Sequence, residues 1–341
     1  MKVFVTGGTG FVGSHIVAAL VAAGHDVRLL VRRPEQVPLT FAPHGISPTD
    51  LVVGDVRDAD LVAHGIGGCD AVVHAAAIFS LRPRDARVIG DTNVVATRVV
   101  LGAAVAAGAD PVVHVSSTAA LVRRDGSGPG LPIGDLTGTY ARSKLDSELV
   151  ARQHQDAGVP VVSIYPGGVH GPLDPYLSEQ NNRLKWVARG LFPIWPKGGN
   201  HMVDVRDVAQ LVVACIEPRR GPRRYVVPGS HVNGRDTFGA VAAAVGRRRP
   251  HVDLPERLAI LLTRPMEPLD RVTSKRWHYP ADVEGIATMA CDTRFDDSPA
   301  RDEFGIEPRP FDDTIRDTVA WLVDAGHLPE RLRPQTPQHT E

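Results

Sequence analysis

The chain has 341 residues, of which 43% are hydrophobic and 23% are charged, a composition typical of a globular protein with a sizeable core. Its 38 basic and 39 acidic residues nearly cancel, so we expect neither nucleic acid nor a membrane as a partner. The three cysteines, Cys69, Cys215 and Cys291, are far apart and follow no metal-ligand spacing. We therefore expect a reduced, cytoplasmic protein that holds no metal.

Short valine-rich runs alternate with alanine-rich helical stretches over the first 165 residues. Strands without polar alternation that are separated by helices indicate a parallel sheet covered on both faces. Because crossover connections are right-handed, we expect an α/β fold, a doubly wound Rossmann sheet. The predicted strands are 2–6, 26–31, 51–53, 71–74, 112–115 and 159–165, and the predicted helices are 11–23, 92–107 and 140–157.

The pattern changes after Pro166. Prolines and tryptophans punctuate residues 172–202, which indicates an insertion and not a sheet element. A helix at 203–217 and a strand at 224–227 are expected to return to the sheet. We assign residues 1–171 together with 203–228 to a dinucleotide-binding domain. Residues 172–202 together with 229–328 are assigned to a smaller, mostly helical substrate domain. Residues 329–341 are poor in apolar residues and are expected to form a disordered tail.

A glycine-rich loop follows the first predicted strand and opens the first predicted helix. It reads Thr6-Gly7-Gly8-Thr9-Gly10-Phe11-Val12-Gly13 and satisfies G-x-G-x-x-G. Glycines at these positions allow a tight turn, a close approach of the backbone to a pyrophosphate, and close packing of the helix on the strand. A glycine turn without a ligand is the alternative. We expect dinucleotide binding by Gly7, Gly10, Phe11, Val12 and Gly13.

The end of the second predicted strand bears on the choice between NAD and NADP. NAD sites usually place an acidic residue there for the ribose 2′-hydroxyl, whereas an arginine accommodates the 2′-phosphate of NADP. The chain has Arg32 and Arg33 before Pro34, with no acid. A guanidinium can hold a phosphate through two hydrogen bonds. We predict NADP, held by Arg32 and Arg33; ordinary surface arginines and an NAD site are the alternatives.

Tyr140 and Lys144 stand at i and i+4 of a predicted helix and are therefore neighbours on one face. A phenol with a pKa of about 10 is a poor acid-base group at neutral pH, and a nearby ammonium lowers that pKa. The strand at 112–115 ends in Ser116 and Ser117, hydroxyls suited to hold a substrate carbonyl. Either serine could instead cap a turn.

Together these motifs resemble the extended short-chain dehydrogenase/reductase family, part of the NAD-dependent epimerase/dehydratase superfamily, and most of all its dihydroflavonol-reductase-like branch. The resemblance covers about residues 1–230. The motifs that carry it are Thr6 to Gly13, Asp55-Val56, His74-Ala75-Ala76-Ala77, Asn93 in Asn-Val-Val-Ala-Thr, Val115-Ser116-Ser117, Tyr140-x-x-x-Lys144, Pro166-Gly-Gly-Val169 and Val203 to Ala209.

The resemblance implies roles for individual residues. Ser117 bonds the substrate oxygen, Tyr140 gives or takes its proton, and Lys144 holds the nicotinamide ribose and tunes the tyrosine. One departure is Tyr165, which stands where the family usually has arginine. Further cofactor contacts are implied for Asp55, Val56, His74, Ala75, Ala76, Asn93, Pro166 and Val169.

The leading hypothesis is an NADP(H)-dependent oxidoreductase that moves a hydride between nicotinamide and a carbonyl or secondary alcohol. Its partner is a small-molecule substrate, and a homodimer is the expected assembly. An NAD-dependent nucleotide-sugar epimerase is one alternative, and a non-catalytic dinucleotide sensor is another. A sugar dehydratase is disfavoured, because Thr118-Ala119-Ala120 stands where those relatives place an Asp-Glu pair.

Overall fold

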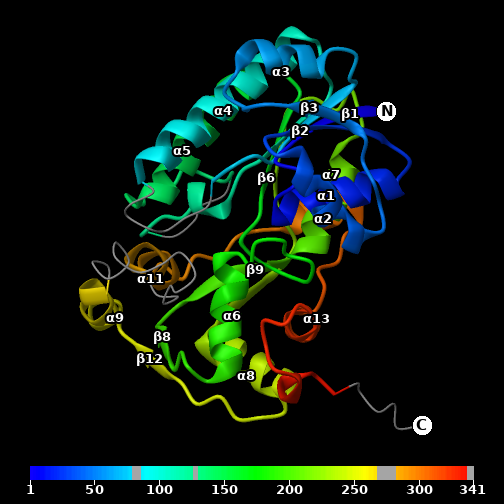
Figure 1. Cartoon of the computed structure of the whole chain (residues 1–341). Helices are drawn as coiled ribbons and strands as arrows, with labels where there is room; N and C mark the ends of the chain where they lie inside the picture. Colours follow the sequence, from blue (N-terminus) through cyan, green and yellow to red (C-terminus); the bar gives the residue numbers. More distant parts are fainter. Residues whose placement is uncertain (79–85, 126–129, 267–281, 336–341) are drawn as a thin grey trace.

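The structure is a computed structural model that describes residues 1–78, 86–125, 130–266 and 282–335 (Figure 1). Its centre is a sheet of seven parallel strands in the order β10-β6-β5-β4-β1-β2-β3. The strand order reverses between β1 and β4, which leaves a crevice at the carboxyl ends of the strands. This confirms the predicted doubly wound α/β fold. The strands are β1 (Lys2–Thr6), β2 (Asp26–Val31), β3 (Asp50–Val53), β4 (Ala71–His74), β5 (Val112–Val115), β6 (Val161–Tyr165) and β10 (Arg223–Val226).

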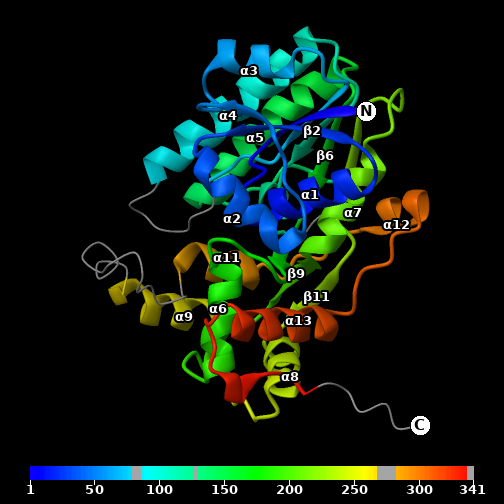
Figure 2. The same ribbon diagram turned by 45° about the vertical axis from the view of Figure 1, so that its right-hand side comes forward.

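Helices cover both faces of this sheet (Figures 1 and 2). Every residue of β4, β5 and β6 is buried, as expected for valine runs without polar alternation. One face packs against α1 (Phe11–Ala22), α2 (Val37–Phe41) and α7 (Val205–Cys215). The other packs against α3 (Ala59–Ile66), α4 (Ala86–Ala106) and α5 (Thr139–Asp156).

Later parts of the chain also join this domain. β10 pairs with β6, α7 packs against α1, and α12 (Ser298–Phe304) packs against β10 and α7, although its range was assigned to the smaller domain. The helix expected at 203–217 begins later than predicted, because Asp204 still belongs to strand β9 (Gly199–Asp204). The Asp204 carboxylate accepts a hydrogen bond from the N–H of Arg206 at 2.8 Å and so caps α7.

The smaller domain has its own apolar core, shared by α6 (Glu179–Arg189), α8 (Gly234–Val245) and α13 (Phe311–Asp324). These three helices lie together below the large sheet in Figure 2. Two further helices, α9 (Glu256–Thr263) and α11 (Val283–Ala290), pack against each other. The predicted mostly helical character of this domain is thus confirmed.

The interpretation of residues 172–202 as free of sheet is wrong. β9 lies in the middle of a three-stranded sheet with β7 (Gly168–His170) and β11 (Ser230–Asn233), and β8 (Ile194–Pro196) pairs with β12 (Val252–Leu254). β8 is only three residues long and ends in a proline, so it carries no periodic pattern. The burial of β9 does not alternate either.

The expectation of a disordered tail is wrong for its first part, and residues 336–341 lie outside the described ranges. Leu332 is 4% exposed and belongs to the core of α6, α8 and α13. None of the helices in the described ranges is long and apolar enough to cross a membrane. Short 3-10 helices are η1 (Pro34–Gln36), η2 (Ala42–His44), η4 (Thr118–Ala120), η5 (Arg264–Met266) and η6 (Glu330–Leu332).

Candidate active site

A cavity of about 1070 Å³ follows the carboxyl ends of the parallel strands and continues to the walls of α6 and α11. It brings together most of the residues singled out in the sequence. His74 and Asn93 are not among the residues that line it. Those that do are Gly7, Gly10, Phe11, Val12, Gly13, Arg32, Arg33, Asp55, Val56, Ala75, Ala76, Ser117, Tyr140, Lys144, Pro166 and Val169.

The glycine loop leaves no room for side chains at two positions. Gly7 has φ +74°, and a Cβ there would lie 2.5 Å from the backbone nitrogen of Ala76. A Cβ at Gly13 would lie 2.0 Å from the carbonyl oxygen of Gly7. The next helix begins at Phe11, and Gly10 provides no side-chain cap, so the N–H groups of its first turn suit an anion. These residues fit a pyrophosphate.

The edge beside β2 and β3 is rich in arginine. Arg32 and Arg33 are exposed and line the cavity. Arg57 grips both carboxylate oxygens of Asp55, at 2.9 Å and 2.8 Å, and these bonds lower the pKa of Asp55 to about 2. Arg57 lines the cavity too. The sequence did not identify it as a site residue, and the only available signal was its position two residues after Asp55. Three guanidinium groups beside one carboxylate fit a ligand phosphate at this end.

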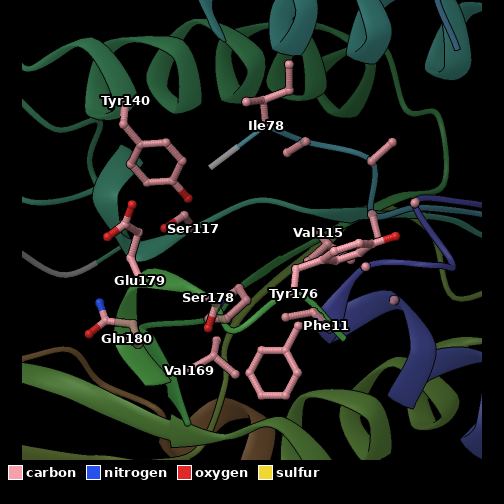
Figure 3. A pocket seen from close by; sticks show the side chains of 18 of the residues that line it. Phe11, Ile78, Val115, Ser117, Tyr140, Val169, Tyr176, Ser178, Glu179 and Gln180 are labelled. Carbon is pink, nitrogen blue, oxygen red and sulfur yellow. The ribbon is translucent and has the colours of Figure 1, made fainter. Parts of the chain in front are cut away.

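At the other end of the cavity three polar side chains meet near the end of β5. The phenol of Tyr140 points toward Ser117 in Figure 3, and the two are hydrogen-bonded. Ser117 Oγ also accepts the N–H of Ala119 at 3.2 Å, capping η4. Lys144, 6% exposed, directs Nζ to the carbonyl of Val115 at 3.4 Å. The phenol and the Ser117 hydroxyl are thus partners, and the ammonium lies at the carbonyl of Val115, two residues before Ser117.

Burial is the main cause of the shifted pKa values of Tyr140 and Lys144. It raises the pKa of Tyr140 to about 12, against the hydrogen bond with Ser117, which lowers it, and a carboxylate from α11, Glu284, raises it further. Burial also lowers the pKa of Lys144 to about 8, while the carboxylate of Glu148 opposes that change. In the cofactor-free protein the tyrosine is therefore a phenol, ready to donate a proton.

His74 and Asn93 support the cavity from behind its walls. The ring of His74 bonds the hydroxyls of Thr6 and Thr97, at 2.8 Å and 3.3 Å, and burial lowers its pKa to about 3. Asn93 accepts the N–H of Ile78, which lines the cavity, at 2.8 Å. It also donates to Ser143 Oγ in α5, at 3.2 Å. Asn93 thereby ties a cavity wall to the helix of Tyr140.

Tyr165 forms part of a buried network beneath α5. Its hydroxyl donates to Glu148 Oε1 at 2.6 Å, and Arg152 Nε donates to the same oxygen at 2.9 Å. Tyr165 and Glu148 are both fully buried. The positive charge that pairs with the Glu148 carboxylate therefore comes from Arg152, one turn further along α5. Tyr165 of β6, at the position where the family usually has arginine, contributes a neutral donor.

The sequence predicts a substrate domain in these ranges, but it singles out none of the individual residues that the smaller domain contributes to the cavity walls. Tyr176 reaches across to Gln36 beside the arginine edge, with its hydroxyl 2.7 Å from Oε1. No motif marks any of these positions, and only the folded chain brings them to the cavity. The remaining wall residues from α6 and α11 include Glu179, Gln180, Asn182, Arg183, Lys185, Glu284, Thr288 and Met289.

Comparison with known proteins places the chain. It is 29% identical over 343 residues to a dihydroflavonol 4-reductase-like protein of Synechocystis sp., covering 95% of each chain. It is also 29% identical over 349 residues to the 4-hydroxy-2-methyl-3-oxo-4-farnesyl-3,4-dihydroquinoline-1-oxide ketoreductase of Stigmatella aurantiaca, covering 97% of this chain and all of that one.

The crystal structure of the UDP-glucose 4-epimerase of Bifidobacterium longum, in complex with NAD+ and UDP, shares the fold. Its TM-score is 0.72 at 21% identity, over 96% of this chain and 99% of that one. The model of the NAD dependent epimerase/dehydratase family matches residues 3–227. These residues hold the glycine loop, the arginine edge and the Ser117, Tyr140 and Lys144 cluster, and the chain belongs to the NAD dependent epimerase/dehydratase family.

Proposed function

We propose that this chain is an NADP(H)-dependent oxidoreductase that interconverts a carbonyl and a secondary alcohol. The observation that carries the proposal is the single cavity that joins the glycine loop to Ser117, Tyr140 and Lys144. A dinucleotide whose pyrophosphate rests on the loop has room to extend toward the tyrosine. The reductases among the relatives support the same reaction class.

The side chains divide the chemistry between them. The cofactor supplies the hydride for the carbonyl carbon. Ser117 holds the carbonyl oxygen, and the phenol of Tyr140 donates its proton to that oxygen, which leaves a tyrosinate. The ammonium of Lys144, one helical turn after Tyr140 on α5, would stabilise this tyrosinate by its charge. In the oxidative direction the same proton returns to Tyr140.

The preference for NADP rests on the arginine edge. Arg32 and Arg33 line the cavity, and no acidic residue stands between β2 and Pro34. The carboxylate of Asp55, which lines the same edge of the cavity, is paired with Arg57, and this pairing reduces its repulsion of a phosphate. We infer that the 2′-phosphate of NADP is favoured here, and NAD is the alternative.

A nucleotide-sugar epimerase is the second candidate, and the polar face of α6 favours it. Glu179 and Gln180 lie in the cavity in Figure 3, and Asn182, Arg183 and Lys185 line it as well. Such a wall suits hydroxyl and phosphate groups. An epimerase would consume no net cofactor, whereas the proposed reductase would.

The test incubates the purified protein with NADPH and a dihydroflavonol, and separately with NAD and UDP-glucose. Net oxidation of NADPH with formation of an alcohol supports the reductase, provided that Tyr140→Phe abolishes it. Interconversion of UDP-glucose with its 4-epimer favours the second candidate. Binding of both cofactors without turnover of any carbonyl in a wider panel indicates a sensor. The homodimer and the cytoplasmic location stay predictions, and light scattering tests the first.

A further inference from the structure

We propose that Glu284 of α11 is a positioning residue for Tyr140. Through Glu284 the smaller domain holds the first turn of α5, the helix that carries Tyr140. The inference rests on the proposed function, because it assigns a role at the same site. It concerns a residue 144 positions away from the tyrosine along the chain, in a helix that also forms a wall of the cavity.

The contact is made by backbone groups of α5. Glu284 Oε1 accepts the N–H of Ala141 at 2.7 Å, and Oε2 accepts the N–H of Tyr140 at 3.3 Å. The residue at the N-cap of α5 is Gly138, which has no side chain to cap the helix. The carboxylate from the smaller domain therefore fills the place of a local capping residue, at the end of the helix where negative charge is favoured.

Glu284 is itself held by its own domain. Asp282 caps α11 by accepting the N–H of Gly285, and it pairs with Arg183 of α6 at 3.2 Å. Thr288 Oγ1 donates to the carbonyl oxygen of Glu284 at 2.9 Å. Because α6 and α11 both line the cavity, a movement of this wall pulls directly on the turn that carries Tyr140.

Gly138 shows how closely the two parts fit. Its φ of −60° and ψ of 153° suit any residue, so backbone conformation does not require glycine here. A Cβ at this position would lie 2.2 Å from Cδ of Glu284. The glycine makes room for the carboxylate from α11, and this offers a way to displace Glu284 without changing its chemistry.

The charge of Glu284 has its own effect on the tyrosine. It raises the pKa of Tyr140 and so keeps the phenol protonated, as a proton donor needs. Burial raises the pKa of Glu284, and the N–H groups of α5 oppose this change. Other titratable or charged groups at this end of the cavity or beside Glu284 are Lys144 on α5, Glu179, Arg183 and Lys185 on α6, and Asp282 before α11.

The first experiment removes the charge and keeps the shape. Glu284→Gln is compared with the unchanged protein in complex with NADP+, and Tyr140 is titrated by the ultraviolet absorbance of tyrosinate, with Tyr140→Phe subtracted. The pKa of Tyr140 should fall by about one pH unit. The pH profile of turnover of a dihydroflavonol should move in the same direction. An unchanged tyrosine pKa overturns the inference.

The second experiment tests the contact by a double-mutant cycle. Gly138→Ala should lower kcat about ten- to hundredfold when Glu284 is present, because the displaced carboxylate releases the turn of Tyr140. In a Glu284→Ala background the same change should cost almost nothing, since the clash is gone. Equal losses in both backgrounds overturn the inference.

A matched control separates positioning from general loss of stability. Asn233→Ala removes the cap of α8 in the same domain, away from the cavity. It should lower Tm and leave the tyrosine pKa unchanged. If Tyr140→Phe itself keeps full turnover, the proposed function fails. If Tyr140→Phe is inactive and the two Glu284 tests are negative, only this inference fails.

Discussion

Replacement of Arg32 and Arg33 by alanine tests the basis of cofactor choice. Both side chains are exposed at the end of β2 and line the cavity. Asp55, which lines the cavity at the same edge, already holds Arg57 at 2.8 Å. A 2′-phosphate at this edge would therefore face mainly positive charge. The hydroxyl of NADH would gain much less from the same groups.

The expected magnitude follows from the contact and its exposure. A charge-assisted hydrogen bond contributes about 1.5 to 3 kcal/mol, and exposure to water and salt favours the lower end of this range. Since about 1.4 kcal/mol corresponds to a factor of ten, Arg32→Ala should weaken NADPH binding about tenfold. The double variant with Arg33→Ala should weaken it about a hundredfold, with NADH binding almost unchanged.

The assay measures Kd for NADPH and NADH by fluorescence at one ionic strength, and then repeats it at higher salt. Arg331→Ala, an exposed arginine that does not line the cavity, is the matched control. The preference for NADPH should shrink with salt in the unchanged protein and vanish in the double variant. A protein that prefers NADH from the start, or a double variant with the original preference, refutes the reasoning.

Three further variants test the loop, the lysine and the buried network. A Cβ at Gly10 would lie 3.3 Å from the carbonyl oxygen of Gly7, so Gly10→Val should fold yet raise the cofactor Kd, and unchanged binding by calorimetry would remove the loop from the site. Burial lowers the pKa of Lys144 from 10.5 to about 8, so between these values Lys144 binds fewer protons in the folded protein than in the unfolded chain, and its own contribution to stability rises with pH in that window. Relative to the unchanged protein, Lys144→Met should therefore lose this contribution between about pH 8 and 10 in urea titrations, and a difference in the free energy of unfolding between the two proteins that does not change with pH contradicts it. Tyr165→Phe removes a donor from the buried carboxylate of Glu148 and should lower the free energy of unfolding by about 1 to 3 kcal/mol; no measurable loss on urea denaturation would show that the bond contributes nothing.

Local patterns were enough to predict the seven strands of the large sheet and the helices α1, α4, α5 and α7, but not α2, α3 or α12. The glycine motif lies within eight consecutive residues, 6–13, and predicts a dinucleotide-binding loop. The valine runs of β4, β5 and β6 lack polar alternation and therefore predict strands that are buried on both faces, as the structure has them. Their spacing of four residues in a helix is enough to predict that Tyr140 and Lys144 lie on the same helical face. Such features depend on neighbours within one or two turns, which a sequence displays directly.

The rest depends on contacts between distant segments. β8 and β9 are strands because β12, β7 and β11 lie beside them, and their own residues give no periodic signal. Glu284 reaches Tyr140 only through the packing of the smaller domain. His74 and Asn93 were expected at the cofactor, but the side chains of both turn toward other polar groups behind the cavity wall. Nothing in a local pattern gives these directions.

Tyr140 is proposed above as the proton donor of a carbonyl reductase. The most direct measurement is single-turnover oxidation of NADPH with a dihydroflavonol, for the unchanged protein and for Tyr140→Phe, together with the Kd of NADPH for both. We predict turnover that falls about 10²- to 10⁴-fold in the variant while the Kd stays the same. A variant with unchanged kcat, or a protein that converts UDP-glucose without net oxidation of NADPH, would contradict it.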